Sequence, residues 1–140
     1  MRNDLRTHLY DIWSPQFGSI WRIENRLFRA SSFAKEKDPN AFHPGLVIDE
    51  TGSQDSFQTA PGTSRYFSKH LDVFQTRLKD RVGNFENAYF QLHLSVPIHK
   101  KTFYQECHRG WWATDSLEKS DIARLKHQLT LRLPYDTIYR

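Results

Sequence analysis

One histidine and a short run of hydroxyl and basic residues are the side chains in this sequence best suited to chemistry. His43 opens the segment HPGLVI, and Thr63, Ser64 and Arg65 close the segment APGTSR. An imidazole transfers protons near neutral pH, a guanidinium binds phosphate through paired hydrogen bonds, and hydroxyl groups orient the phosphate. Cleavage of RNA without a metal needs a base for the 2′-hydroxyl, a cation for the phosphoryl oxygens and an acid for the departing oxygen. These residues supply all three in principle.

The two segments must lie side by side for that chemistry to occur. The unbroken apolar run GLVID, 45–49, predicts a strand buried on both faces. FQTAPGTS, 57–64, is predicted to be the next strand, ending in a Pro-Gly turn. If the strands are antiparallel, the start of the first and the end of the second meet at one end of the sheet. That arrangement puts His43 near Thr63, Ser64 and Arg65.

The rest of the chain reads as short strands followed by a helix. The expected elements are an N-terminal arm or short helix (1–15), a strand at 16–23, a helix or strand within 65–87, a strand at 88–98, a short strand and turn at 102–112, and a helix at 115–129. Ile122, Leu125 and Leu129 form an apolar stripe on the last helix, and Pro134 is expected to limit it. We therefore expect a mostly β domain, a small barrel or strongly bent sheet, closed by a C-terminal helix.

Composition indicates one folded domain spanning residues 1–140. Of the 140 residues, 38% are hydrophobic and 14% are aromatic, too many for a disordered chain. The formal net charge is +4, which favours a polyanionic partner only weakly, because many soluble proteins are equally basic.

Cysteine and histidine usage argues against metal and disulfide chemistry. Cys107 is the only cysteine, so an internal disulfide is impossible and a reducing compartment is expected. The seven histidines lack HExxH or paired Cys/His spacing, and no glycine-rich phosphate loop or G-x-S-x-G elbow is present. The segment MRNDLRTHLYDIW has no apolar run typical of a secretory signal. We expect a cytoplasmic protein with no metal, no cofactor and no membrane segment.

An ordered set of short motifs resembles the MazF/PemK toxins of type II toxin–antitoxin systems. The family has strands of the G-x-I-W-x-I, R-P-x-L-V-I and P-x-T-S kinds, and this sequence has the similar segments GSIWRI, HPGLVI and APGTS in the same order. The family then has a late L-P strand and a closing helix, to which SVPI and DSLEKSDIARLKHQL are similar. The resemblance covers roughly residues 16–131. It departs from the family at His43, because the family has arginine before that proline.

The resemblance implies an SH3-like barrel with accessory helices, usually a homodimer. It implies metal-independent, sequence-selective cleavage of single-stranded RNA, restrained by a cognate antitoxin protein. The family's catalytic pair falls on the residue before Pro44 and on Thr63. We expect His43 to act as acid or base, Thr63 and Ser64 to position the phosphate, and Arg65 to stabilise charge.

Three further side chains are candidates for RNA binding. Trp111 has a ring that stacks on bases in principle, and Lys100 and Lys101 are cations suited to phosphates. The ordinary alternatives are an aromatic core or interface residue and a solvated basic loop. Equally ordinary roles for His43 and Arg65 are a turn residue ahead of a core strand and a solvated surface cation.

Two other functions remain open at this stage. One is a non-catalytic SH3-like barrel that binds nucleic acid or a protein partner. The other is an unrelated small β protein with a structural or regulatory role.

Overall fold

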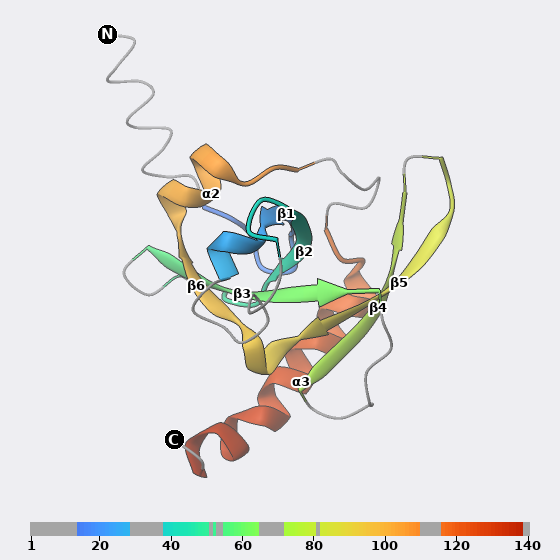
Figure 1. Cartoon of the computed structure of the whole chain (residues 1–140). Helices are drawn as coiled ribbons and strands as arrows, with labels where there is room; N and C mark the ends of the chain where they lie inside the picture. Colours follow the sequence, from blue (N-terminus) through green and yellow to red (C-terminus); the bar gives the residue numbers. More distant parts are fainter. Residues whose placement is uncertain are drawn as a thin grey trace, which may run out of the picture.

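The computed structural model describes residues 14–28, 38–50, 52, 55–64, 72–80, 82–109 and 116–138, and Figure 1 shows the arrangement of their elements. The expected N-terminal arm falls almost entirely outside these residues. The strands are β1 (Ile20–Glu24), β2 (Phe42–Val47), β3 (Ser56–Thr63), β4 (Val73–Lys79), β5 (Phe85–Gln91) and β6 (Val96–His99). The helical segments are η1 (Asn25–Phe28), η3 (Leu92–Leu94), α2 (Lys100–Glu106) and α3 (Lys119–Ile138). The fold is therefore mostly β, as predicted, with a C-terminal helix.

The six strands form one antiparallel sheet with β3 at its centre. The strand order is β1-β2-β3-β5-β4, and β6 also pairs with β3. β2 pairs with β3 in the register Gly45↔Pro61, while β6 pairs with the first half of β3 and β5 with its last two residues, Gly62 and Thr63. One strand thus carries partners from both halves of the chain, and the sheet bends around it.

Apolar side chains pack on both faces of this sheet, and each face has its own helix. On one face, Leu46 and Phe90 pack with Leu125 of α3. On the other face, Val47 packs with Phe103 of α2. Figure 1 shows α3 beside β4 and β5 and α2 next to β6. Leu46 and Val47 are adjacent and each 0% exposed, which confirms the predicted burial of this strand on both faces.

Three predictions about where strands begin or end are wrong. β3 does not turn at Pro61-Gly62 but continues to Thr63, because Pro61 pairs with Gly45 and both residues are buried. The single strand predicted at 88–98 is two strands, β5 and β6, separated by η3. The pairing of β5 with β4 ends at Gln91, and the chain then turns so that β6 pairs with the start of β3. β1 also begins later than predicted, since residues 17–18 form a turn.

The helical predictions need three changes. Residues 100–106 form α2 instead of the expected strand, because His99 Nδ1 accepts a hydrogen bond from the Lys101 backbone N–H and caps the helix. Within 65–87, the described residues form β4, a turn and the start of β5, with no helix among them, which resolves the alternative that the sequence left open. α3 passes Pro134 and ends at Ile138, so the expected limit of the helix at this proline is wrong. No described helix has the length and apolar character needed to cross a bilayer.

Candidate functional site

A pocket of about 270 Å³ lies where β2 begins and β3, β4 and the outer half of β5 approach one another. Its described lining residues are His43, Pro44, Gly62, Thr63, Ser64, Leu78, Asp80, Glu86 and Ala88. The antiparallel register that the sequence predicted is present, and its continuation from Gly45↔Pro61 puts His43 opposite Thr63. The structure therefore brings His43 together with Thr63 and Ser64, which follow it by 20 and 21 positions in the sequence.

The side chain of Asn25 determines the tautomer of the neutral His43 ring. His43 Nδ1 lies 2.6 Å from Asn25 Oδ1, and Asn25 Nδ2 donates a 2.8 Å hydrogen bond to the carbonyl oxygen of Asp38. Because that carbonyl only accepts, the amide nitrogen of Asn25 must face it, and the amide oxygen must face the imidazole. Nδ1 of His43 is then the protonated nitrogen. In the neutral ring the lone pair is on Nε2, which is the arrangement that a general base needs.

Strand packing explains why a buried amide reaches this ring. Ile23 of β1 pairs with His43 of β2, and the chain then turns into η1, where Asn25 is 1% exposed. The two strands approach closely because Gly45 has no side chain: a Cβ there would overlap Cδ1 of Ile23. Gly45 of the HPGLVI segment thus allows the close strand packing that places His43, two residues before it, beside Asn25.

A second glycine shapes the floor of the pocket. A Cβ on Gly62 would lie 2.7 Å from the Phe90 ring and 3.0 Å from Cγ of Pro44. No real side chain tolerates the first distance, so the residue before Thr63 must be glycine for β3 to pass over this ring. Proline and glycine in HPG and APG are therefore packing residues of strands, although their types suggested turns.

Two carboxylates in the pocket escaped the sequence analysis. Asp80 directly follows β4, and its Oδ1 accepts hydrogen bonds of 2.9 Å from the backbone N–H groups of Val82 and Asn84, so it holds the β4–β5 turn. Glu86 is exposed and has no hydrogen-bond or ion-pair partner within the described part of the chain. The signal that points to both is the turn sequence DRVGN, because a hairpin there pairs Glu86 with Leu78 and leaves Asp80 two residues beyond Leu78 on the same face, in the pocket that Thr63 also lines.

The other predicted site residues are not part of this pocket as described. Lys100 and Lys101 follow His99, which pairs with Ser56 at the opposite end of β3. Seven residue steps separate Ser56 from Thr63, which at about 3.3 Å per residue is roughly 23 Å. Lys100 is also buried at 7% exposure. Arg65 and Trp111 lie outside the described residues.

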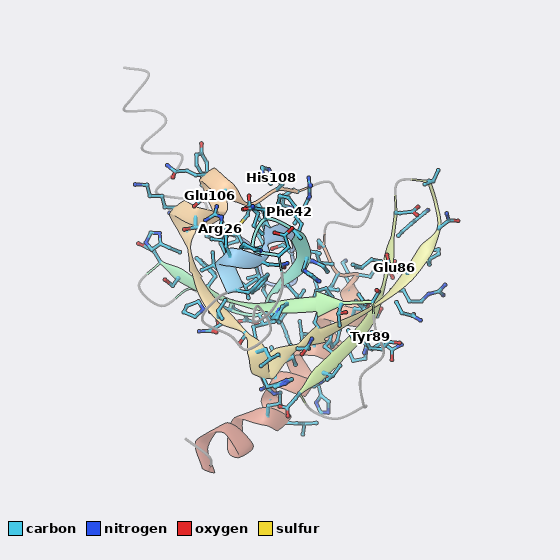
Figure 2. The ribbon with its side chains drawn as sticks, viewed as in Figure 1. Arg26, Phe42, Glu86, Tyr89, Glu106 and His108 are labelled. Atoms are coloured by element: carbon cyan, nitrogen blue, oxygen red, sulfur yellow. The ribbon has the colours of Figure 1, made fainter. Side chains whose placement is uncertain are left out.

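A separate polar cluster lies beside α2, away from the pocket. Arg26 forms ion pairs with Glu106 and, at 2.8 Å, with Glu24, and these bonds raise the pKa of its guanidinium above its usual value. Next to it, burial and then the charge of Glu106 raise the pKa of the Cys107 thiol to about 12. Figure 2 shows Arg26 and Glu106 beside α2 and Glu86 on the β4–β5 side. A paired arginine and a thiol kept neutral by burial favour a structural role for this cluster.

The described residues contain no group of three or more His, Cys, Asp or Glu side chains that could hold a metal ion. Among the described lining residues of the pocket, the titratable groups are one imidazole and two carboxylates, accompanied by two hydroxyl groups. In comparisons with known proteins, no family model matches the chain, and no curated protein matches it.

Proposed function

We propose that this protein is an endoribonuclease that cleaves single-stranded RNA by attack of the 2′-hydroxyl, without a metal ion. The observation that carries the proposal is the pairing of an oriented histidine with two hydroxyl residues in one pocket. His43 has its Nδ1 on the Asn25 amide, and Thr63 and Ser64 line the same space. A base held by a third group is the arrangement that activates a weak nucleophile.

The pocket residues divide the chemistry as follows. One of them takes the proton of the 2′-hydroxyl, whose oxygen attacks the phosphorus atom, and the bond from phosphorus to the 5′-oxygen breaks. The products are a 2′,3′-cyclic phosphate and a 5′-hydroxyl that has received a proton from an acid. His43 is one of the two proton-transfer groups, and Glu86 supplies the other. Thr63 and Ser64 donate hydrogen bonds to the phosphoryl oxygens.

The resemblance to the MazF/PemK toxins supports the same function. Its catalytic pair falls on His43 and Thr63, which line one pocket here. We also propose the finer fold that the resemblance implies, an SH3-like barrel, since β3 pairs with β2, β6 and β5 and the sheet bends around it. The partners would be single-stranded RNA, a cognate antitoxin and a second copy of the chain. Arg65 follows Ser64 directly and would stabilise the phosphate charge.

The charge of the pocket favours one alternative. Its described lining contains two carboxylates and neither lysine nor arginine, and carboxylates repel phosphate. A protein of the same fold that binds RNA or a protein partner elsewhere on its surface, without cleavage, is therefore the second candidate.

The deciding experiment is incubation of the purified protein with a long single-stranded RNA in excess EDTA. We expect discrete fragments that end in a 2′,3′-cyclic phosphate. His43→Ala should slow cleavage by roughly a hundredfold or more, the usual contribution of a positioned proton-transfer group. His127→Ala, which removes an exposed histidine of α3, is the matched control and should keep the wild-type rate. Intact RNA with folded wild-type protein would reject the nuclease and leave the binding protein.

A further inference from the structure

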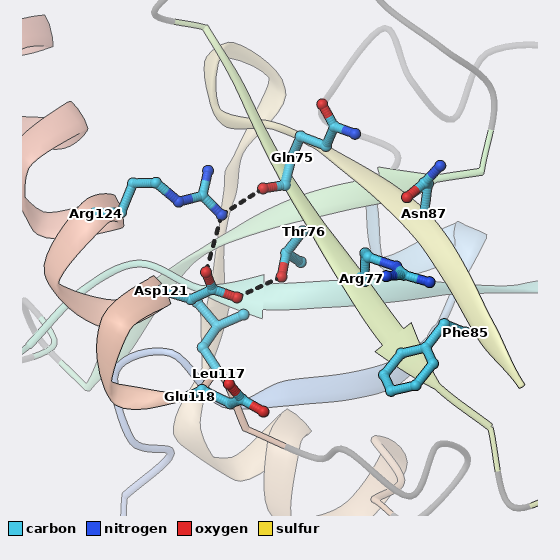
Figure 3. Close-up of a pocket in the computed structure, with 9 residues that line it drawn as sticks. All are labelled: Gln75, Thr76, Arg77, Phe85, Asn87, Leu117, Glu118, Asp121 and Arg124. Carbon is cyan, nitrogen blue, oxygen red and sulfur yellow. Dashed lines mark hydrogen bonds and ion pairs between the residues drawn. The ribbon is translucent and has the colours of Figure 1, made fainter. Parts of the chain in front are cut away.

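The β4–β5 hairpin presents a different surface on each of its faces. Side chains alternate between the faces of a strand, so Leu78, Asp80 and Glu86 line the pocket of His43 while their neighbours Arg77, Phe85 and Asn87 line another hollow. That hollow continues round β4 to Thr76, on the same face as Leu78. That second hollow has a volume of about 490 Å³ and lies between the hairpin and α3 (Figure 3). The space is in the usual size range of ligand sites.

Cations and an aromatic ring gather on this second face. Phe85 is 56% exposed, the guanidinium carbon of Arg77 lies 4.7 Å from its ring centroid, and Nζ of Lys79 lies 5.9 Å from it. Asn87 stands opposite Arg77 in the register. We call Arg77, Lys79, Phe85 and Asn87 the hairpin ridge. An exposed ring with cations and an amide beside it combines a stacking surface, phosphate contacts and base-edge hydrogen bonds.

Among the described residues, none pairs with the edge of β4 where the ridge lies. Arg124 and Gln128 of α3 donate hydrogen bonds of 2.6 and 2.8 Å to the backbone oxygens of Gln75 and Val73, which covers the first half of this edge. No such bond reaches Arg77 or Lys79 in the part of the chain that the structure describes. The described residues therefore leave this part of the β4 edge accessible to a flexible chain.

Charge decides which kind of chain fits. The described lining of this hollow holds two carboxylates, Asp121 and the exposed Glu118. Asp121 is already engaged, because its Oδ1 pairs with Arg124 at 3.0 Å and its Oδ2 accepts a 2.6 Å hydrogen bond from Thr76. Arg77 and Lys79 carry their charges on the exposed face, whereas the pocket across the hairpin carries two carboxylates. A polyanion is attracted to the ridge and not to the pocket, so the ridge must supply the affinity that the pocket lacks.

We propose that the hairpin ridge is the RNA-binding subsite of this protein, which stacks a base on Phe85 and holds the adjoining phosphates with Arg77 and Lys79. The inference rests on the proposed function for its ligand, single-stranded RNA. It assigns binding to one face of the hairpin and cleavage to the other.

The test uses a fully 2′-O-methylated single-stranded oligoribonucleotide, which has no 2′-hydroxyl to attack and so reports binding alone. Phe85→Ala and Arg77→Gln should each weaken binding by roughly tenfold or more, the range of one stacked base. Arg77→Gln should also lower the slope of log K against log salt by about 0.7, the share of one phosphate contact on a single strand. Phe85→Tyr, which keeps the ring, should retain the affinity.

Two matched variants control for general surface effects. Tyr104→Ala removes an aromatic side chain that is 57% exposed on α2, and Arg109→Gln removes an exposed arginine that lies 5.0 Å from the ring of Trp21. If the ridge variants bind as these two do, the inference is wrong. It is also wrong if Phe85→Ala turns a dimer into a monomer in sedimentation, because the ridge is then a contact between protein copies. Cleavage of unmodified RNA is scored separately, so loss of either result leaves the other interpretable.

Discussion

The bond between Asn25 and His43 gives the sharpest test of how the site is built. Asn25 is 1% exposed and makes two side-chain hydrogen bonds, one to His43 and one to the carbonyl of Asp38. Asp38 is exposed and His43 is half-buried, so water can reach both partners once the amide is gone. Asn25→Ala therefore forfeits little more than the net value of two hydrogen bonds, about 1 kcal/mol each and about 2 kcal/mol together. A domain of ordinary stability, about 5–15 kcal/mol, stays folded after that loss.

The assay is a double-mutant cycle in urea. His43→Ala removes one of the two bonds, so the Asn25→Ala/His43→Ala protein should be more stable, by about 1 kcal/mol, than the sum of the two single losses predicts. The tautomer is measured in parallel by nitrogen-15 NMR, where His43 should show a protonated Nδ1 in the wild type and lose that preference in Asn25→Ala. Simple additivity in the cycle, or an Nε2-protonated ring in the wild type, would refute the reasoning.

Three other predictions concern the frame around the site. Gly62→Ala should destabilise the protein by about 1–3 kcal/mol in urea, because its Cβ would lie 2.7 Å from the Phe90 ring; unchanged stability would contradict the close packing. The pKa of Cys107 is raised from 9.0 to about 12, so the neutral thiol contributes fully to stability below pH 9.0, and that contribution is lost as the pH rises towards 12. The native thiol should resist a disulfide reagent at pH 8. Cys107→Ala should reduce the fall in unfolding free energy between pH 9 and pH 12. Gln128→Ala should cost about 1 kcal/mol and promote aggregation, measured by light scattering, because it uncovers the Val73 oxygen on an edge strand.

The pairing of β2 with β3 was predictable because both strands carry their signal locally. The apolar run at Leu46, Val47 and Ile48 identifies a buried strand, and nearness in sequence makes an antiparallel neighbour of the next strand the simplest topology. The proline and glycine residues beside these apolar runs led to one wrong prediction, a turn at the end of the second strand. Proline and glycine at 44–45 and 61–62 favour turns, yet they lie inside strands because Ile23 and Phe90 occupy the space that a side chain would need.

The carboxylates of the pocket were missed because the 65–87 segment has two competing periodicities. Leu71, Phe74 and Leu78 match a helix, whereas Phe74, Thr76 and Leu78 alternate as in a strand, and all three of the latter are buried. Only the packing of Phe74 against the sheet decides between them. Without the hairpin, nothing connects Glu86 to His43, which lies 43 positions earlier in the sequence.

Asn25 illustrates a limit of a different kind. An asparagine at a strand end is an ordinary turn residue, and nothing within several positions of it marks a buried partner. Its role depends on the register Ile23↔His43 between β1 and β2, and a shift of that register by one residue would place another side chain opposite the ring. Residue types alone therefore suggested the imidazole, while the group that orients it required the three-dimensional structure.

The central position of β3 explains how one pocket is both firmly built and accessible. Thr63 is the last residue of β3 and pairs with Tyr89 of β5, and the continuation of the β2 register brings His43 to its other side. A strand with partners on both sides has its backbone hydrogen bonds satisfied and little freedom to move. Ser64 follows where the strand ends and is exposed. The two hydroxyl groups at this point are held in place by the sheet and remain accessible to solvent, so they can position a bound phosphate group. Next along β5, Phe85 and Glu86 are adjacent and face opposite sides of the hairpin, so a single strand fixes the ridge and the pocket relative to each other.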